Sequence, residues 1–164
     1  MTYTDYSLVD MLRKAGLRIA VAESCTGGKV ADAIISVPGS SAVFEYGAVV
    51  YSDKMKIEKL SVSQRLIEKH TSVSAECAVA MAKGVMKKTN ANMGLSVTGY
   101  AGPDGADVGL VYIGVATALG SRSYRLRFSG SREEVRCNAA KTAIGVALRH
   151  AMQLIKNGES EKRN

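Results

Sequence analysis

The sequence contains few of the residues that build disulfide frameworks or metal centres. Its 164 residues include three cysteines, none of them in a CxxC pair, and two histidines without an HExxH motif. Three scattered cysteines are too few for a disulfide framework, so we expect all of them to be reduced thiols. A metal site built by the protein is not expected either, because no cluster of His, Cys and acidic residues is present.

Long apolar runs and a secretion signal are also absent. The longest apolar runs, such as residues 109–119, reach about half of the ~20 residues that cross a bilayer. The first residues, MTYTD, lack a basic region followed by an apolar stretch. We therefore expect a cytoplasmic protein without membrane attachment.

Charge and composition indicate one folded domain. Lys and Arg number 22 against 15 Asp and Glu, which gives a net charge of +7. The basic residues are spread along the chain, with short clusters only at 87–88 and 161–163. A diffuse surplus of this kind is usually solvated surface, so nucleic-acid binding is not expected. The apolar content of 46% suits a single domain, which we place at residues 1–158, followed by a frayed tail at 159–164.

Apolar periodicity predicts alternating helices and strands. Helical spacing is present over residues 4–15, 29–37, 53–70, 74–90 and 131–156. Apolar runs typical of strands cover residues 17–22, 43–51, 93–98, 109–117 and 123–128. Ser74 is expected to cap one helix, and Ser131 with Glu134 to form a capping box on the last. This order predicts a three-layer α/β/α sandwich on a mixed, mostly parallel sheet of about five strands.

The first candidate site follows the first predicted strand. Ser24 lies where this buried strand meets a helix, in the motif ESCTGG. Ligands of open α/β sheets gather at the carboxyl ends of strands, and N–H groups at a helix N-terminus can hold an anion or oxyanion. Gly27 and Gly28 would let a ligand approach the backbone closely. The alternative is that Ser24 or Thr26 merely caps the helix.

A second predicted strand is also followed by a glycine-containing segment. Thr98 ends the third predicted strand, and residues 99–105 that follow contain three glycines and a proline. Such a loop is either shaped around a ligand or is an ordinary crossover. Two such strand ends in one small domain favour a ligand site between them.

A serine nucleophile would need a base from another residue type. Neither histidine is suitably placed, so the candidate base is a lysine kept neutral by burial or by neighbouring cations. Tyr51 ends the second predicted strand, and Lys56 follows five residues later. Lys54, Lys56 and Lys59 are all possible bases, and the alternative is that all three are solvated.

The last predicted helix begins with two arginines on one stripe. Arg132 and Arg136 are four residues apart. Continuing that step gives Ala140, Ile144, Leu148 and Met152, which we expect to face the core. Arginine is seldom buried without a partner, and a helix N-terminus with guanidinium groups suits a carboxylate or phosphate. The alternative is a structural ion pair with Glu133, Glu134 or a more distant acid.

Taken together, these motifs resemble the C-terminal domain of the competence/damage-inducible protein CinA, a family that includes stand-alone nicotinamide mononucleotide amidohydrolases. The matching segments are AESCTGG (22–28), PGSS (38–41), GAVVYS (47–52), VS (73–74), TGYAGPDG (98–105), GLVYIGVA (109–116) and FSGSR (128–132). They occur in family order and cover nearly the whole chain.

The resemblance implies hydrolysis of the carboxamide of nicotinamide mononucleotide to nicotinate mononucleotide and ammonia. This is a salvage step for pyridine nucleotides that needs no metal or cofactor. It implies Ser24 as nucleophile, Lys56 and Tyr51 as groups that assist proton transfer, and the same α/β/α fold, often as a homodimer. The expected substrate-binding residues are Thr26, Gly27, Gly28, Thr98, Gly99, Arg132 and Arg136. Either arginine could hold the phosphate, with Arg132 favoured by the resemblance.

Some positions differ from the family pattern. Tyr100 stands where the family usually has an aliphatic residue, residues 106–108 replace a longer polar insertion, and Ser131 replaces a common acidic residue. The bulkier side chain and the shorter loop motivate one alternative, an enzyme acting on a different amide. The charge of +7 motivates another, a non-catalytic module that binds a nucleotide or nucleic acid.

Overall fold

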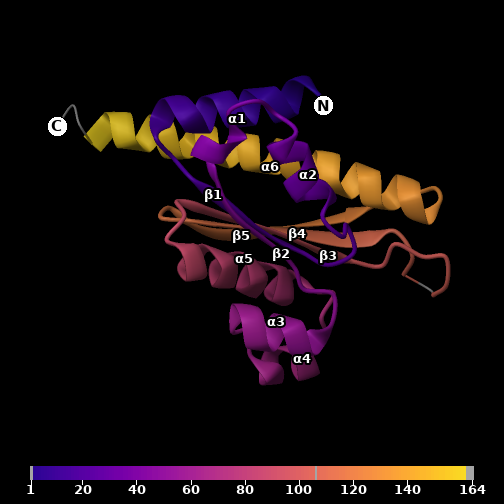
Figure 1. The fold of residues 1–164 in the computed structure, drawn as a ribbon. Helices are drawn as coiled ribbons and strands as arrows, with labels where there is room; N and C mark the ends of the chain where they lie inside the picture. The colour runs from indigo at the N-terminus through magenta and orange to yellow at the C-terminus, as the bar shows by residue number, and fades with distance from the viewer. Residues whose placement is uncertain (1, 106, 162–164) are drawn as a thin grey trace.

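The computed structural model describes residues 2–105 and 107–161, and within them a sheet of five strands in the order β2-β1-β3-β4-β5 (Figure 1). The strands are β1 (Ile19–Glu23), β2 (Phe44–Val49), β3 (Met93–Gly99), β4 (Leu110–Thr117) and β5 (Gly120–Arg127). β1 pairs in parallel with β2 and β3, whereas β4 is antiparallel to β3 and to β5. Only β4 is therefore reversed, and the predicted mixed, mostly parallel sheet is confirmed.

Helices cover both faces of this sheet. One face carries α1 (Tyr3–Ala15), α2 (Lys29–Ile35) and α6 (Arg132–Glu161), and the other carries α3 (Asp53–Leu60), α4 (Gln64–His70) and α5 (Ala75–Thr89) (Figure 1). A short 3-10 helix, η1 (Ser40–Ala42), precedes β2. The three-layer α/β/α architecture is thus as predicted.

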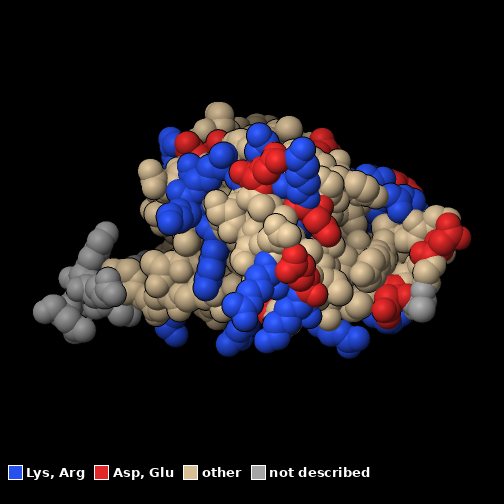
Figure 2. Space-filling view, turned by 90° about the horizontal axis from the view of Figure 1, so that it is seen from below, with Lys and Arg blue, Asp and Glu red and all other residues tan. Residues whose placement is uncertain are grey.

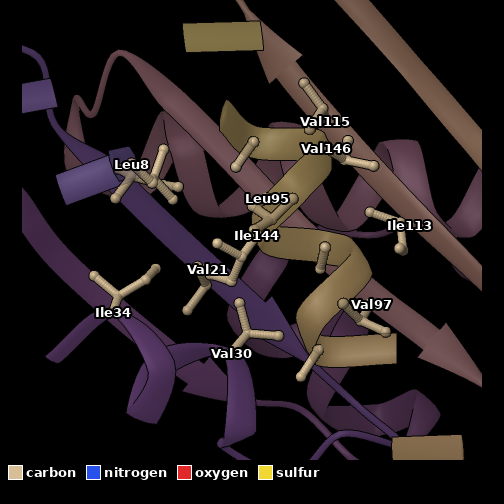
Figure 3. Close-up of a cluster of buried hydrophobic side chains, with 14 of the residues drawn as sticks. Leu8, Val21, Val30, Ile34, Leu95, Val97, Ile113, Val115, Ile144 and Val146 are labelled. Carbon is tan, nitrogen blue, oxygen red and sulfur yellow. The ribbon is translucent and has the colours of Figure 1, made fainter. Parts of the chain in front are cut away.

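Strand alternation divides the core into two clusters. Val21 of β1 faces α2 and α6, where it packs with Leu95 and Ile144 (Figure 3). The alternate residues Ala20 and Ala22 face α5 and join its buried side chains. Every residue of β1 is buried, because a strand covered on both faces needs no polar side.

The predicted helix caps form. Cys77 N donates to Ser74 Oγ at 3.1 Å at the start of α5. At the start of α6, Glu134 N donates to Ser131 Oγ at 3.3 Å and Ser131 N donates to Glu134 Oε2 at 2.7 Å. These reciprocal bonds make the capping box, in which each side chain satisfies a backbone donor of the other residue.

The end of α6 differs from the prediction. The helix continues through Gly158 to Glu161 instead of ending near Lys156, because a glycine costs a helix only about 1 kcal/mol and no proline follows. Residues 162–164 of the predicted tail, and Ala106 of the shortened loop, lie outside the described residues.

The predicted buried stripe of α6, made of residues spaced four apart, is buried only in its middle. Ala140 and Ile144 are buried, but Met152 is 52% exposed. Each four-residue step turns roughly 40° beyond a full rotation, so two further steps from Ile144 carry Met152 off the buried face. Arg132, in the first turn, is exposed because it meets loops at the strand ends and not the core.

His150 of α6 is held neutral by its surroundings. Its Nε2 lies 2.8 Å from the hydroxyl of Tyr124, and the two rings meet edge to face. Burial lowers the pKa of His150 below its usual 6.5, and the positive charges of Arg122 and Arg149 lower it further. The folded protein therefore favours the uncharged imidazole.

Acidification should consequently lower the free energy of unfolding through His150. The unfolded chain binds this proton first as the pH falls, so the stabilisation is complete above the usual pKa and is lost as the pH approaches the lower folded value. Urea denaturation between about pH 7 and about pH 5.5 should show a smaller loss in His150→Gln than in the parent protein. Equal losses in the two proteins would contradict this assignment, since all other titrating groups are shared.

Candidate active site

Three of the predicted site residues follow or end parallel strands at the carboxyl end of the sheet, which is called the sheet edge below. β2, β1 and β3 are neighbours and run in parallel, so their carboxyl ends face the same way. Tyr51, Ser24 and Thr98 lie at these three ends. Ser24 N donates to Val97 O at 2.9 Å, which continues the β1–β3 ladder one residue beyond β1. The ends of β1 and β3, which carry the two glycine-containing segments, therefore lie side by side.

The edge has two sides with different residues. Ala20 and Ala22 of β1 face α5, and the same alternation turns Ser24 toward that side. Thr98 also faces it, since its hydroxyl donates to Ser72 O at 2.7 Å, just before α5. Tyr51 belongs to the opposite side, where its hydroxyl accepts a hydrogen bond from α6. A ligand that touches both sets must lie across the edge.

Ser24 is buried, yet its side chain is uncommitted. Within residues 2–105 and 107–161, its hydroxyl makes no hydrogen bond. The neighbouring thiol of Cys25 is a poor alternative nucleophile, because burial raises its pKa to about 11 and keeps it protonated. Of the two adjacent groups, the hydroxyl is the one available for chemistry.

The structure distinguishes the three candidate lysines. Ser52 caps α3 by accepting from Met55 N at 3.2 Å, and this start turns Lys56 and Leu60 inward. Lys56 is only 2% exposed, whereas Lys54 and Lys59 are on the surface. The sequence alone could not choose among them, because the choice depends on the register that the cap sets.

The buried amine of Lys56 has few close polar partners. Its Nζ lies 3.6 Å from Asp53 Oδ1, and no hydrogen bond holds it among the residues that the structure describes. It also lies near Cys77 at the start of α5: burial raises the pKa of that thiol to about 11, and the charge of Lys56 partly opposes the rise. Lys56 is therefore a sparsely bonded, buried amine on the side of the sheet that carries α3 and α5.

Glu23 was missed by sequence reasoning, although it is central to the site. Its side chain is 1% exposed, and its carboxylate accepts hydrogen bonds from Gly28 N at 3.0 Å, Val30 N at 3.1 Å and Ala31 N at 2.8 Å. Glu23 therefore caps α2, and the alternative that Ser24 or Thr26 does so is wrong. The available signal was an acidic residue at the end of an apolar strand, directly before a glycine-rich turn.

The glycines of the turn are less open to a ligand than predicted. Gly28 N is taken by Glu23, and Gly27 N donates to Ser24 O at 3.1 Å. These two N–H groups are therefore used within the turn, while the predicted close approach of a ligand to Gly27 and Gly28 stays a prediction. Both glycines have positive φ, +60° and +100°, so they are needed for the shape of the turn.

Thr26, Thr98 and Gly99 lie deeper than expected of ligand contacts. Both threonines are fully buried, and Thr26 Oγ1 has no hydrogen-bond partner in the described part of the chain. A Cβ at Gly99 would lie 2.7 Å from Leu110 O, so this glycine permits the close approach of β4. These residues support the edge from beneath.

The two arginines of α6 have different partners. Arg132 is exposed and donates through Nη1 to Gly102 O at 2.5 Å and through Nη2 to the hydroxyl of Tyr51 at 3.2 Å. Arg136 donates instead to the carbonyl oxygens of Cys25 and Thr26. Arg132 thus keeps donors open to solvent beside the edge, whereas Arg136 is bound to the turn that follows Ser24.

The larger of the described hollows lies elsewhere. It has a volume of about 890 Å³ between α1 and the end of α6, where Met11 and Leu154 line it. That place is about 33 Å along α6 from Arg132 at 1.5 Å per residue. The chemistry of the side chains, and not the size of a hollow, therefore locates the candidate site.

Neither a metal site nor a membrane span is found where the structure describes the chain. No group of three or more His, Cys, Asp and Glu residues within residues 2–105 and 107–161 is placed to hold a metal ion. Over the same residues, no helix is both long enough and apolar enough to pass through a membrane.

Comparison with known proteins identifies the family. A family model, the CinA C-terminal domain, matches residues 2–152. The chain belongs to this family. A CinA-like protein of Myxococcus xanthus is 45% identical over 150 residues, which cover 88% of this chain and 36% of that protein. A CinA-like protein of Dictyoglomus thermophilum is 42% identical over 152 residues, which cover 90% and 37%. The chain thus spans a little over a third of these relatives.

Solved CinA structures have the same fold. A CinA superfamily protein from Klebsiella pneumoniae superposes with a TM-score of 0.88 at 28% identity, covering 92% of this chain and 96% of the other. A competence/damage-inducible protein from Agrobacterium tumefaciens gives a TM-score of 0.83 at 32% identity, covering 91% and 98%. The resemblance inferred from the ESCTGG and TGYAGPDG segments is confirmed for family and fold.

Proposed function

We propose that this CinA domain is an amidohydrolase that converts nicotinamide mononucleotide to nicotinate mononucleotide and ammonia. The observation that carries the proposal is the burial of both a serine hydroxyl that follows β1 and a lysine amine of α3, Ser24 being 7% and Lys56 2% exposed. Arg132, across the edge, supplies a guanidinium for a phosphate. The motif resemblance supports the choice of substrate.

The proposed reaction has two stages. With Lys56 as the base, Ser24 gives up its proton, and its oxygen attacks the carboxamide carbon and forms a tetrahedral intermediate. The carbon–nitrogen bond then breaks, the proton passes to the leaving nitrogen, and ammonia departs from an acyl-enzyme. Water attacks this ester, with Lys56 again as base, and releases the carboxylate and Ser24. Tyr51, held by Arg132 on the opposite side, assists proton transfer at the leaving group.

A second candidate is hydrolysis of a different amide by the same residues. Tyr100 follows β3 directly and is 42% exposed, so an aromatic side chain borders the edge. A bulky group there changes which amides fit beside Ser24. Ammonia release from a panel of aromatic and aliphatic carboxamides, with nicotinamide mononucleotide included, separates the two candidates.

Polyanion binding has less support from the surface. Figure 2, seen from the α3–α5 side, shows Lys and Arg in several separate groups with Asp and Glu among them. Some of the basic residues are also paired, as in the ion pair between Lys54 and Glu58. No activity on the carboxamide panel, together with salt-sensitive binding of an oligonucleotide, would favour this function over hydrolysis.

Ser24→Ala should abolish turnover and preserve the fold. Loss of a covalent nucleophile lowers kcat by at least about a thousandfold, and the hydroxyl has no hydrogen bond to lose in the described structure. Ammonia release and the thermal unfolding midpoint test both expectations. Cys25→Ala is the matched neighbour and should stay active. An inactive Cys25→Ala beside an active Ser24→Ala would instead identify a thiol nucleophile.

Lys56→Met should remove the base. General-base catalysis contributes about 10²- to 10⁴-fold, and methionine fills the buried site with a side chain of similar length. Ammonia release should fall by that factor in Lys56→Met, and the thermal unfolding midpoint should show that the variant is folded. Lys54→Met, on the exposed face of α3, is the control. Normal activity in Lys56→Met would rule out this lysine as the base.

Arg132→Gln should weaken recognition of the phosphate. Charge-assisted hydrogen bonds contribute roughly 1.5–3 kcal/mol, which predicts a fall in kcat/KM of about 10- to 150-fold for the mononucleotide. Activity on the dephosphorylated riboside should hardly change. Arg65→Gln, in the exposed part of α4, serves as control. An equal loss on both substrates would show that Arg132 organises the site and does not contact phosphate.

A further inference from the structure

The turn formed by residues 24–28 is held on both sides by buried or partly buried charged groups. Glu23, before the turn, accepts from the N–H groups of Gly28, Val30 and Ala31. Arg136, from α6, donates from Nε to Cys25 O at 3.0 Å and from Nη2 to Thr26 O at 3.1 Å. One group fixes the donors after the turn, and the other fixes the acceptors within it.

Arg136 uses the whole fork of its guanidinium. Its third nitrogen, Nη1, donates to Glu133 Oε2 at 3.0 Å, and Glu133 Oε1 lies 2.7 Å from Lys29 Nζ. The first turns of α6 and α2 are thereby joined through one carboxylate. Three directed donors in a fixed plane are a property of arginine that a lysine ammonium does not reproduce.

Gly27 provides the space for this contact. A Cβ at this position would lie 3.0 Å from Arg136 Nη2, closer than ordinary packing allows. The glycine therefore serves two needs, the positive φ of the turn and the close approach of the guanidinium. The turn and α6 fit each other although 111 residues separate Cys25 from Arg136.

We propose that Arg136 is a positioning residue that, together with Glu23, holds the backbone beside Ser24 in the geometry needed for attack. It acts through the carbonyl groups of Cys25 and Thr26 and does not contact the phosphate. This inference rests on the proposed function for its kinetic consequence, but the restraint on the turn is independent of the substrate. Small displacements of a nucleophile have large effects, about 100-fold for 1 Å.

The first test measures the turn directly. Hydrogen exchange, followed by mass spectrometry on the full chain, should be faster over residues 24–31 in Arg136→Gln than in the parent protein. Residues 75–89 of α5 should exchange at the parent rate in the same sample, which shows that the variant is folded. Arg149→Gln, on the exposed side of α6, is the matched control. Unchanged exchange over 24–31 would overturn the proposal, whatever the protein hydrolyses.

The second test separates positioning from phosphate binding. Arg136→Gln should lower kcat by about 100-fold and leave KM within about twofold, with the same loss for mononucleotide and riboside. Arg136→Lys should recover little, because it lacks the fork. A loss confined to KM for the mononucleotide, or full recovery by lysine, would overturn the positioning role.

The third test measures covalent labelling of Ser24 and needs no substrate. A fluorophosphonate should label Ser24 of the parent protein, and Arg136→Gln should slow that labelling by a similar factor. Parent protein that labels but releases no ammonia from nicotinamide mononucleotide would defeat the proposed substrate only. Glu133→Gln keeps both bonds from Arg136 to the turn and should have a smaller effect. Equal labelling of Arg136→Gln and parent would overturn the inference.

Discussion

The carboxylate of Glu23 accepts three backbone hydrogen bonds at the start of α2, and the geometry of the sheet edge depends on this interaction. A helix of seven residues has little stability by itself, because most of its backbone groups lie in its end turns. A buried carboxylate is costly unless it is hydrogen-bonded. The carboxylate of Glu23 and the backbone N–H groups at the start of α2 therefore satisfy each other's hydrogen-bonding capacity. These bonds fix the turn that joins β1 to α2. Ser24 is the first residue of that turn.

This interaction also occupies the N-terminus of α2. The N-terminus of a helix usually attracts negative charge, but at α2 the position is already filled by a residue of the chain itself. Among the charged side chains beside this end of the sheet, Arg132 is exposed and bonds to Gly102 O and the hydroxyl of Tyr51. Tyr51 and Arg132 thus lie together on one side, and Ser24 and Thr98 turn toward the other.

The sequence predicts those features that arise from local pattern. Strands covered on both faces are apolar throughout, and the caps at Ser74 and Ser131 depend on residues only three positions apart. The role of Arg136 could not be predicted, because its carbonyl partners are more than a hundred residues away. Glu23 is close to its partners in sequence, yet a carboxylate at a strand end indicates a ligand site as readily as a helix cap.

Glu23 and Lys56 are both deeply buried charged side chains, and they differ in their hydrogen bonds. Glu23 has three close hydrogen bonds to backbone donors, an arrangement that stabilises the start of α2. Lys56 is almost as deeply buried, but its closest acid is 3.6 Å away at the exposed Asp53. A structural lysine at that depth would be expected to form close hydrogen bonds. The residues that the structure describes give Lys56 none, so the fold compensates the buried charge of Lys56 far less than that of Glu23.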